Sequence, residues 1–144
     1  MKKLMVLLCS IMLVLFVQGC GSSSGNGLKN EKVENYLVKV TYDGKELKSY
    51  SIADIKKMPA SSFELEGKTE QGPSMDYILK DNDIKDYSKV TFIGMYKDSL
   101  TMTKDQIEKG TLFDITNHDT IKLAAKDIKK DKWTKDIATI KVEK

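Results

Sequence analysis

The chain has 144 residues, of which 24 are lysine or arginine and 21 are aspartate or glutamate, so its formal net charge is only +3. This near-balance excludes the broad positive field of a nucleic-acid-binding protein, and we expect no nucleic-acid partner. All 24 basic residues are lysine, so the chain has no guanidinium fork that could hold a phosphate or carboxylate through two parallel hydrogen bonds. An anion site would have to use lysine, hydroxyl groups and backbone amides.

The first twenty residues have the order of a signal peptide. Lys2 and Lys3 supply positive charge, residues 4–17 are almost entirely apolar, and the apolar run ends shortly before Cys20. A membrane-spanning helix needs about 20 apolar residues, which is more than this run provides. Residues 21–27 are glycine, serine and asparagine, a composition that predicts a flexible tether rather than the flank of a spanning helix.

The residues that end at Cys20 resemble the lipobox of bacterial lipoproteins, although Gln18 stands where Ala, Ser or Thr is usual. The resemblance implies that residues 1–19 are removed and that Cys20 receives a thioether-linked diacylglycerol, often with a further acyl chain such as palmitate. Residues 20–33 would then form the tether. Two or three acyl chains hold a protein durably on a bilayer. We therefore expect a lipid-anchored protein on the extracytoplasmic face of the cell membrane, with the bilayer as a partner through Cys20.

This reading also limits the chemistry of the exported part. Cys9 would leave with the signal peptide and the sulfur of Cys20 would be committed to lipid, so no thiol would remain for a disulfide, a metal or catalysis. Loss of Lys2 and Lys3 would leave 22 basic and 21 acidic residues, a net charge of +1. The fold would have to be stabilised by its core alone.

Residues 34–144 have the length of one domain and contain alternating short elements of both kinds. Alternating apolar residues predict a strand at 36–42, and Asp43-Gly44 predicts a tight turn into a return strand at 46–50. Ser51 is a candidate N-cap of a helix that Pro59 stops. Further strands are expected at 62–65, 90–94, 100–102, 112–115, 121–125 and 138–142, a loop at 66–72, and two more helices after Ser74 and Thr103.

The spacing between these elements decides the fold class. The helices lie too close to their neighbouring strands for a regular array of parallel strands, in which each crossover takes a dozen or more residues. We therefore predict an α+β domain with three short helices and a mixed, largely antiparallel sheet. The strand at 90–94 is the best candidate for a central position.

Four blocks of the sequence, taken in order, resemble the molybdopterin-binding domain of the sulfite-oxidase-like oxidoreductases. The blocks are residues 50–59 (YSIADIKKMP), 72–80 (GPSMDYILK), 99–107 (SLTMTKDQI) and 132–137 (KWTKDI). The resemblance implies a sulfite-oxidase-like fold over residues 36–142. It also implies a former cofactor cleft flanked by Tyr96, Asp98, Ser99 and Trp133, which are the candidate ligand-binding residues.

The chain departs from that family where the cofactor would be held. Catalytic members bind molybdenum through a cysteine thiolate after an early strand and hold the pterin phosphate with arginines. Here the corresponding residues 64–67 contain no cysteine, and Lys122 stands where an arginine is frequent. Carboxylates and hydroxyls do not replace a soft thiolate, and lysine is a poorer clamp for phosphate. The resemblance thus implies the fold and argues against the family's chemistry.

Three other features could carry chemistry. His118, the only histidine, lies in a polar segment typical of a hairpin turn, and we expect a structural or solvated role for it. A zinc site would have to use carboxylates alone beside it, and a serine triad would lack the glycines of a nucleophile elbow. Asp81-Asn82-Asp83 begins like a calcium loop but lacks the loop's glycine and closing glutamate, so we expect a turn that ends a helix. Residues 126–135 hold five lysines and two aspartates, which favours a solvated loop over a site for anionic lipid headgroups.

Two classes of function remain open. The first is a non-catalytic binding module for a small ligand or an envelope protein. The second is a redox enzyme that uses molybdopterin or another cofactor, or an accessory subunit of a membrane oxidoreductase. We favour the first and expect no catalytic residue, no metal and no cofactor, with molybdopterin as the alternative.

Overall fold

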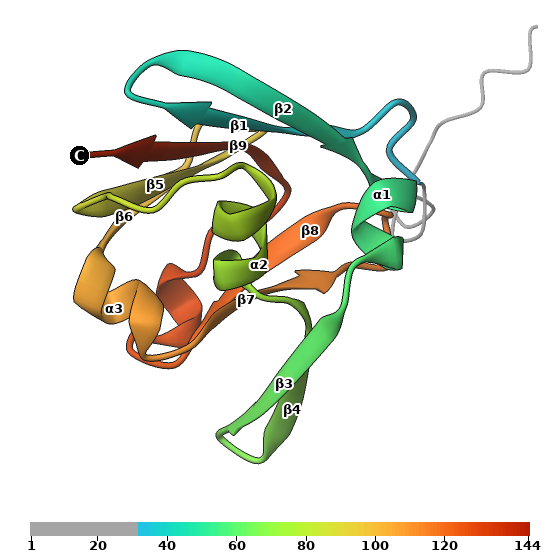
Figure 1. Cartoon of the computed structure of the whole chain (residues 1–144). Helices are drawn as coiled ribbons and strands as arrows, with labels where there is room; N and C mark the ends of the chain where they lie inside the picture. Colours follow the sequence, from blue (N-terminus) through green and yellow to red (C-terminus); the bar gives the residue numbers. More distant parts are fainter. Residues whose placement is uncertain (1–31) are drawn as a thin grey trace, which may run out of the picture.

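The computed structural model describes residues 32–144 (Figure 1). The predicted signal peptide, Cys20 and most of the predicted tether lie outside these residues. None of the helices within residues 32–144 is long and apolar enough to cross a membrane.

A five-stranded sheet with the order β2-β1-β9-β5-β6 forms one layer of the domain (Figure 1). Its strands are β1 (Leu37–Tyr42), β2 (Lys45–Ser51), β5 (Lys89–Gly94), β6 (Ser99–Thr103) and β9 (Ile137–Glu143). β1 and β9 are parallel, whereas the other neighbours are antiparallel. The last strand of the chain therefore occupies the middle of the sheet, with β5 beside it.

Two separate hairpins complete the strands. One is β3 (Ala60–Leu65) with β4 (Lys68–Pro73), and the other is β7 (Thr111–Ile115) with β8 (Ile121–Ala125). The base of β4 lies against β7 so closely that a Cβ added to Gly72 would sit 1.8 Å from the carbonyl oxygen of Phe113. The tip of the β3–β4 hairpin projects away from the rest of the domain (Figure 1).

Three short helices, α1 (Ile52–Lys57), α2 (Met75–Asp81) and α3 (Lys104–Glu108), begin after hydroxyl residues. Ser51, Ser74 and Thr103 are the N-caps, and Ser51 and Thr103 each form a full capping box. Such caps satisfy backbone N–H groups that a helix leaves open at its start. A single 3₁₀ turn, Lys130–Lys132, precedes β9.

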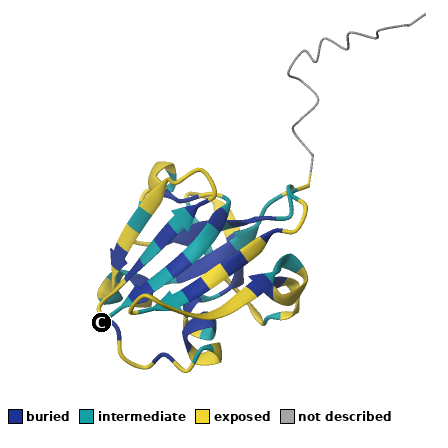
Figure 2. Cartoon of the chain, turned by 90° about the horizontal axis from the view of Figure 1, so that it is seen from above, coloured by how far each residue is buried: buried dark blue, intermediate teal, exposed yellow. Residues whose placement is uncertain are grey.

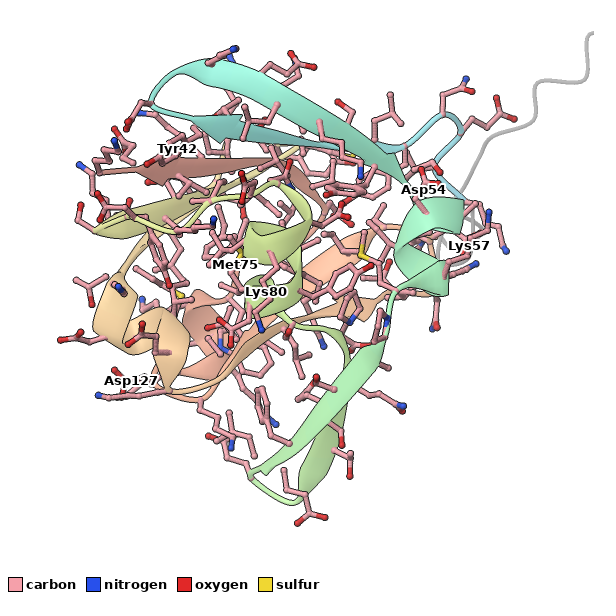
Figure 3. All side chains as sticks on the ribbon, in the orientation of Figure 1. Tyr42, Asp54, Lys57, Met75, Lys80 and Asp127 are labelled. Atoms are coloured by element: carbon pink, nitrogen blue, oxygen red, sulfur yellow. The ribbon has the colours of Figure 1, made fainter. Side chains whose placement is uncertain are left out.

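The core lies between the five-stranded sheet and the β7–β8 hairpin. Phe92 of β5 and Phe113 of β7 meet edge to face with ring centres 5.8 Å apart, and both are fully buried. Buried residues alternate with more exposed ones along the strands (Figure 2). Met75 of α2, which is labelled in Figure 3, is fully buried and joins the helix to this core. Burial of these apolar side chains is the main driving force for the fold.

The described chain begins beside α1 and the β7–β8 turn. Lys32 and Lys56 both form ion pairs with Asp119, at 2.7 and 3.0 Å, and the Val33 N–H donates to the carbonyl oxygen of His118 at 2.9 Å. Residues that we assigned to the end of the tether thus contact the domain at the same side as α1.

The predicted fold class is confirmed: the domain is α+β, with a mixed, mostly antiparallel sheet and three short α-helices. The predicted loop at 66–72 is wrong, because residues 68–73 form β4 and pair with β3. The segment Lys-Thr-Glu-Gln-Gly has little β-strand propensity of its own, so its pairing is decided by tertiary contacts. Glu66 and Gly67, with φ of 53° and 72°, form the two-residue turn of this hairpin.

Candidate functional site

The structure separates Trp133 from the other predicted ligand-binding residues. Tyr96, Asp98 and Ser99 lie at the exposed β5–β6 turn, where Tyr96 is 79% exposed, whereas Trp133 is 7% exposed. The β5–β6 turn contacts the segment that follows Trp133, because the Met95 N–H donates to the Asp136 carbonyl oxygen at 2.8 Å. The pocket that Trp133 lines nevertheless includes none of the three turn residues.

Asp98 has a local role in that turn. Its Oδ1 atom and the carbonyl oxygen of Lys135 lie 2.1 and 2.8 Å from where a Cβ on Gly94 would be. The turn therefore packs tightly against the segment that leads into β9.

Trp133 lines a pocket of about 410 Å³, which we name the lysine pocket. It lies between the β3–β4 hairpin, β8 and the segment before β9. The residues that line it are Glu66, Lys68, Glu70, Lys122, Lys130, Trp133 and Lys135. Four lysines and two glutamates give the lining a net charge of +2, although Asp114, which is not part of the lining, also pairs with Lys122 at 3.0 Å.

Trp133 is held in one orientation by polar contacts. Its indole N–H donates to the carbonyl oxygen of Ile128 at 2.9 Å. The ammonium groups of Lys122 and Lys130 lie 5.7 and 5.8 Å from its ring centre, within the range of cation–π attraction. Two of the lysines that line the pocket thus lie beside the indole ring.

The buried carboxylate of Glu70 fixes the same two lysines from the other side. Glu70 is 5% exposed, and its two oxygens lie 3.4 Å from Lys122 Nζ and 3.6 Å from Lys130 Nζ. A buried carboxylate is costly unless it is paired. Lys130 also donates to the Leu65 carbonyl oxygen at 2.8 Å. Glu70 and the hairpin backbone therefore position the lysines before any ligand binds.

The pKa of Lys122 remains above its ordinary value in this setting. Burial of the ammonium group lowers the pKa, but the hydrogen bond and charge of Asp114, followed by the charge of Glu70, together raise the pKa by more than burial lowers it. Lys122 is therefore charged at neutral pH. The pocket presents fixed positive charge beside an aromatic ring.

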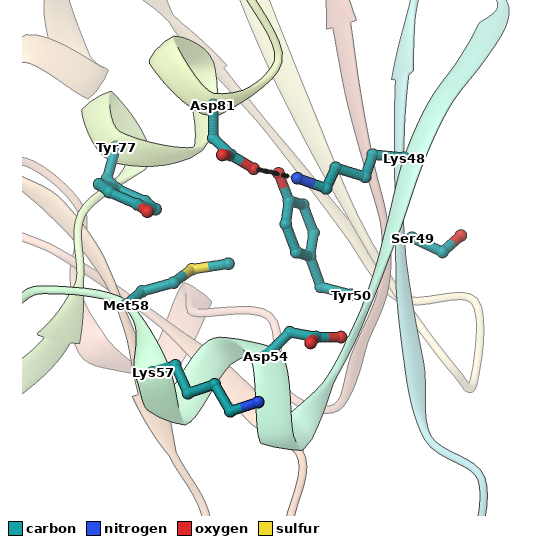
Figure 4. A pocket seen from close by; sticks show the side chains of 8 residues that line it. All are labelled: Lys48, Ser49, Tyr50, Asp54, Lys57, Met58, Tyr77 and Asp81. Atoms are coloured by element: carbon teal, nitrogen blue, oxygen red, sulfur yellow. Dashed lines mark hydrogen bonds and ion pairs between the residues drawn. The ribbon is translucent and has the colours of Figure 1, made fainter.

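A second cleft, of about 310 Å³, lies between β2, α1 and α2, and we name it the α1–α2 cleft (Figure 4). Its lining is Lys48, Ser49, Tyr50, Asp54, Lys57, Met58, Tyr77 and Asp81. Two lysines and two aspartates give this lining no net charge. It differs in this respect from the lysine pocket.

A hydrogen-bond network centred on Asp81 forms one wall of the α1–α2 cleft. The Tyr50 hydroxyl donates to Asp81 Oδ2, and Lys48 Nζ donates to the same oxygen at 2.7 Å (Figure 4). Asn82 donates to the Tyr50 hydroxyl at 2.7 Å. The hydrogen bond from Lys48, followed by that from Tyr50, lowers the pKa of Asp81, while burial and then Asp81 raise the pKa of Tyr50. Asp81 is therefore ionised and Tyr50 neutral at neutral pH.

The remaining sequence candidates lie in turns. His118 is in the β7–β8 turn, where its N–H bonds to Thr116 Oγ1 at 3.2 Å. Asn82 ends α2, and its side chain donates to the Ile78 carbonyl oxygen at 2.8 Å. Both expected turns are confirmed. Within residues 32–144, no three histidine, cysteine, aspartate or glutamate side chains are grouped so that they could hold a metal ion.

Sequence reasoning missed most of both pockets. Glu70 was placed in a loop, and residues 126–135 were expected to be solvated, whereas Lys130, Trp133 and Lys135 line the lysine pocket. The one available signal was that Lys68 and Glu70 are two residues apart, so that they share a face if the segment is a strand.

Comparison with known proteins adds no relative. No model of a known protein family matches the sequence, and a search of curated proteins finds no match. Function must therefore be inferred from the chain's own residues.

Proposed function

We propose that this protein is a membrane-anchored extracytoplasmic lipoprotein whose domain binds a small anionic ligand in the lysine pocket without transforming it. Anchoring is supported by the sequence up to Cys20, which resembles a lipobox. Ligand binding is supported above all by one observation: a buried carboxylate, Glu70, holds Lys122 and Lys130 beside Trp133. A sulfite-oxidase-like fold remains part of this proposal.

The charges of the lysine pocket favour an anionic ligand. Glu70 is already paired with Lys122 and Lys130, while Lys68 and Lys135 line the opening and are exposed. Among residues 32–144, neither Lys68 nor Lys135 has a carboxylate within ion-pair distance. A carboxylate or phosphate could bridge these two ammonium groups. Because lysine binds as a point charge and the site is open to solvent, we expect affinity to fall as salt is added.

Binding without chemistry is favoured by the sequence. A chain processed at Cys20 keeps no free thiol, and a thiolate is the molybdenum ligand of the family that it resembles. The positive charges at the lysine pocket are suited to holding an anion. The pairing with Glu70 orders Lys122 and Lys130 without supplying a nucleophile.

The anchor is tested in the native host. Cells grown with a radiolabelled fatty acid should label the wild-type protein, which should sediment with membranes. Cys20→Ala should abolish the label and leave the protein uncleaved at this position. Label on Cys20→Ala, or no label on the wild type, would overturn the anchoring proposal.

The ligand site is tested with the detergent-solubilised full chain and calorimetric titration of inorganic phosphate and citrate. We expect binding that weakens with salt and that falls about tenfold or more in Lys68→Ala/Lys135→Ala, which corresponds to about 1.4 kcal/mol. Lys45→Ala/Lys85→Ala is the matched control, because it removes the same charge from exposed positions outside the pocket. Equal losses in both double variants, or no binding by the wild type, would contradict a built anion site.

A further inference from the structure

The α1–α2 cleft brings two carboxylates and two ammonium groups to one small cavity. Asp54 and Lys57 come from α1, Asp81 from the last turn of α2, and Lys48 from β2 (Figure 4). Figure 3 shows Asp54 and Lys57 on the surface of α1. Charges of both signs that line one cleft are suited to a ligand that itself has both signs.

Both carboxylates are oriented by bonds to one oxygen only. Asp54 Oδ2 accepts the Ser51 N–H at 2.9 Å and the Ser51 hydroxyl at 2.6 Å. Asp81 Oδ2 accepts both Lys48 and Tyr50. Within the described residues, the Oδ1 atom of each aspartate receives no hydrogen bond. Each side chain is thus fixed in place with one acceptor oxygen open to a ligand.

Lys48 shows how an ammonium group fits the Asp81 wall. Its Nζ lies 2.7 Å from Asp81 Oδ2 and 5.0 Å from the centre of the Tyr50 ring. A carboxylate together with an aromatic face is the usual arrangement for recognising an ammonium ion. Lys48 is half-exposed, with 49% of its side chain accessible, so a ligand can displace it. The chain's own lysine therefore occupies the position that a ligand ammonium would take.

The other side of the cleft can hold an anion and an apolar group. Lys57 is exposed, and its charge acts on Asp54, where it contributes to the lowered pKa of that carboxyl after the two Ser51 hydrogen bonds. Among the described residues, Lys57 has no carboxylate within ion-pair distance. Met58 and Tyr77, both half-buried, provide the apolar part of the wall. The volume of about 310 Å³ is large enough for a ligand of about the size of an amino acid.

We infer that the α1–α2 cleft is a second ligand site, specific for a small zwitterion whose ammonium group displaces Lys48 from Asp81 while its anionic group pairs with Lys57. This site is separate from the lysine pocket, with which it shares no lining residue. The same chemistry is found in free amino acids and in the ethanolamine phosphate headgroup of lipids. The headgroup is a relevant source because the described chain enters the domain beside α1, where Lys32 and Lys56 meet at Asp119.

Calorimetric titration of the detergent-solubilised full chain tests this inference. The probes are the common amino acids, taken one at a time, and phosphoethanolamine. We expect one of the two classes to bind, amino acids if the ligand is a soluble metabolite and phosphoethanolamine if it is a headgroup. For the best binder, analogues that lack either the amine or the acid group should bind at least about tenfold more weakly. Failure of both classes, or equal binding of a singly charged analogue, would overturn the inference.

Two substitutions give opposite expected results. Lys57→Ala should weaken binding of the best zwitterion about tenfold, whereas Lys48→Met, which keeps the length of the side chain, should strengthen it because the competitor for Asp81 is gone. A weakening by Lys48→Met would contradict the proposed ammonium position. Lys68→Ala/Lys135→Ala should leave zwitterion binding unchanged, which separates this site from the proposed anion site. Thermal unfolding of each variant checks that the fold is retained.

Discussion

The lysine pocket and the α1–α2 cleft differ in how far apart in the sequence their lining residues lie. The lysine pocket joins β4, β8 and the segment before β9, so Glu70 meets Lys122 and Lys130, which lie 52 and 60 residues further along the chain. Most of the α1–α2 cleft comes from residues 48–58, closed by α2. The first pocket therefore depends on how distant hairpins pack, and the second on how one short helix starts.

The two sites also differ in how they keep their charges ordered. In the lysine pocket, a carboxylate that is almost fully buried holds two ammonium groups at 3.4 and 3.6 Å. In the α1–α2 cleft, exposed carboxylates are oriented by the Ser51 cap and by Tyr50. Burial makes the first arrangement costly to break, whereas solvent can compensate for losses in the second.

Gly72→Ala should disturb the base of the β3–β4 hairpin, the hairpin that supplies Glu70 to the lysine pocket, and cause the largest loss of stability. A Cβ at this position would lie 1.8 Å from the Phe113 carbonyl oxygen, which is part of the backbone and has no side-chain freedom to move away. We expect a loss of about 3 kcal/mol or more in the free energy of unfolding, measured by urea denaturation, because β4 must separate from β7.

Gly67→Ala is the matched control in the same hairpin. A Cβ there would meet nothing within 4 Å, and only the positive φ of 72° opposes it, so a loss of about 1 kcal/mol is expected. If both variants lose the same free energy, backbone conformation rather than the close approach of β4 to β7 explains the cost.

Glu70→Ala should have the next largest effect, because it leaves Lys122 and Lys130 without their shared partner. We expect a loss of about 2 kcal/mol in the free energy of unfolding, since Lys122 and Lys130 lose their charge-assisted contacts with Glu70, although Asp114 and Glu66 still pair with them. Glu64→Ala, on the exposed face of β3, is the control and should change stability by less than about 0.5 kcal/mol. Equal denaturation midpoints for the two variants would show that Glu70 does not hold the lysines in place.

Local parts of the fold could be predicted from the sequence because their causes are local. The alternation of Val38 and Val40 with Lys39 and Thr41 marks β1, and Asp43-Gly44 forms the expected turn with positive φ at both residues. Ser51 and Thr103 are N-caps, as predicted. In each case the side chain three residues later, Asp54 or Gln106, completes a capping box. Each of these features depends on at most a few adjacent residues.

The parts that the sequence did not predict depend on distant contacts. β9 pairs in parallel with β1, Lys39 opposite Thr139, and only this pairing places β9 rather than β5 at the centre of the sheet. β4 is polar and was mistaken for a loop because its pairing partner and the ion pairs of Glu70 do not show in its composition. The same distance effect explains why Trp133 lines a pocket with Lys122 rather than with Tyr96.

Ser51→Ala should separate the two sites, because it affects only the one built on α1. The Ser51 side chain accepts the Asp54 N–H at 3.2 Å and donates to Asp54 Oδ2. We expect a loss of about 1 kcal/mol in stability, as for other N-caps. Zwitterion binding at the α1–α2 cleft should weaken, and anion binding at the lysine pocket should not. Ser62→Ala, exposed on β3, is the control; a loss of anion binding in Ser51→Ala would show that the two sites are coupled.

The smallest expected effect is the dependence of stability on acid through Asp81. The folded-state pKa of Asp81 lies below its ordinary value, first because of the hydrogen bond from Lys48 and then because of that from Tyr50. The contribution of the Asp81 carboxylate to folding stability is therefore fully present above the ordinary pKa of about 4. It is lost as the pH falls through the lowered pKa. Asp81→Asn should therefore reduce the loss of stability between about pH 4 and pH 2, by well under 1 kcal/mol because the side chain is solvated. Asp83→Asn, two residues further along the chain and 87% exposed in its ion pair with Lys85, is the control. A flatter profile in Asp83→Asn than in Asp81→Asn would mean that the network around Tyr50 does not hold the Asp81 carboxylate in its charged form.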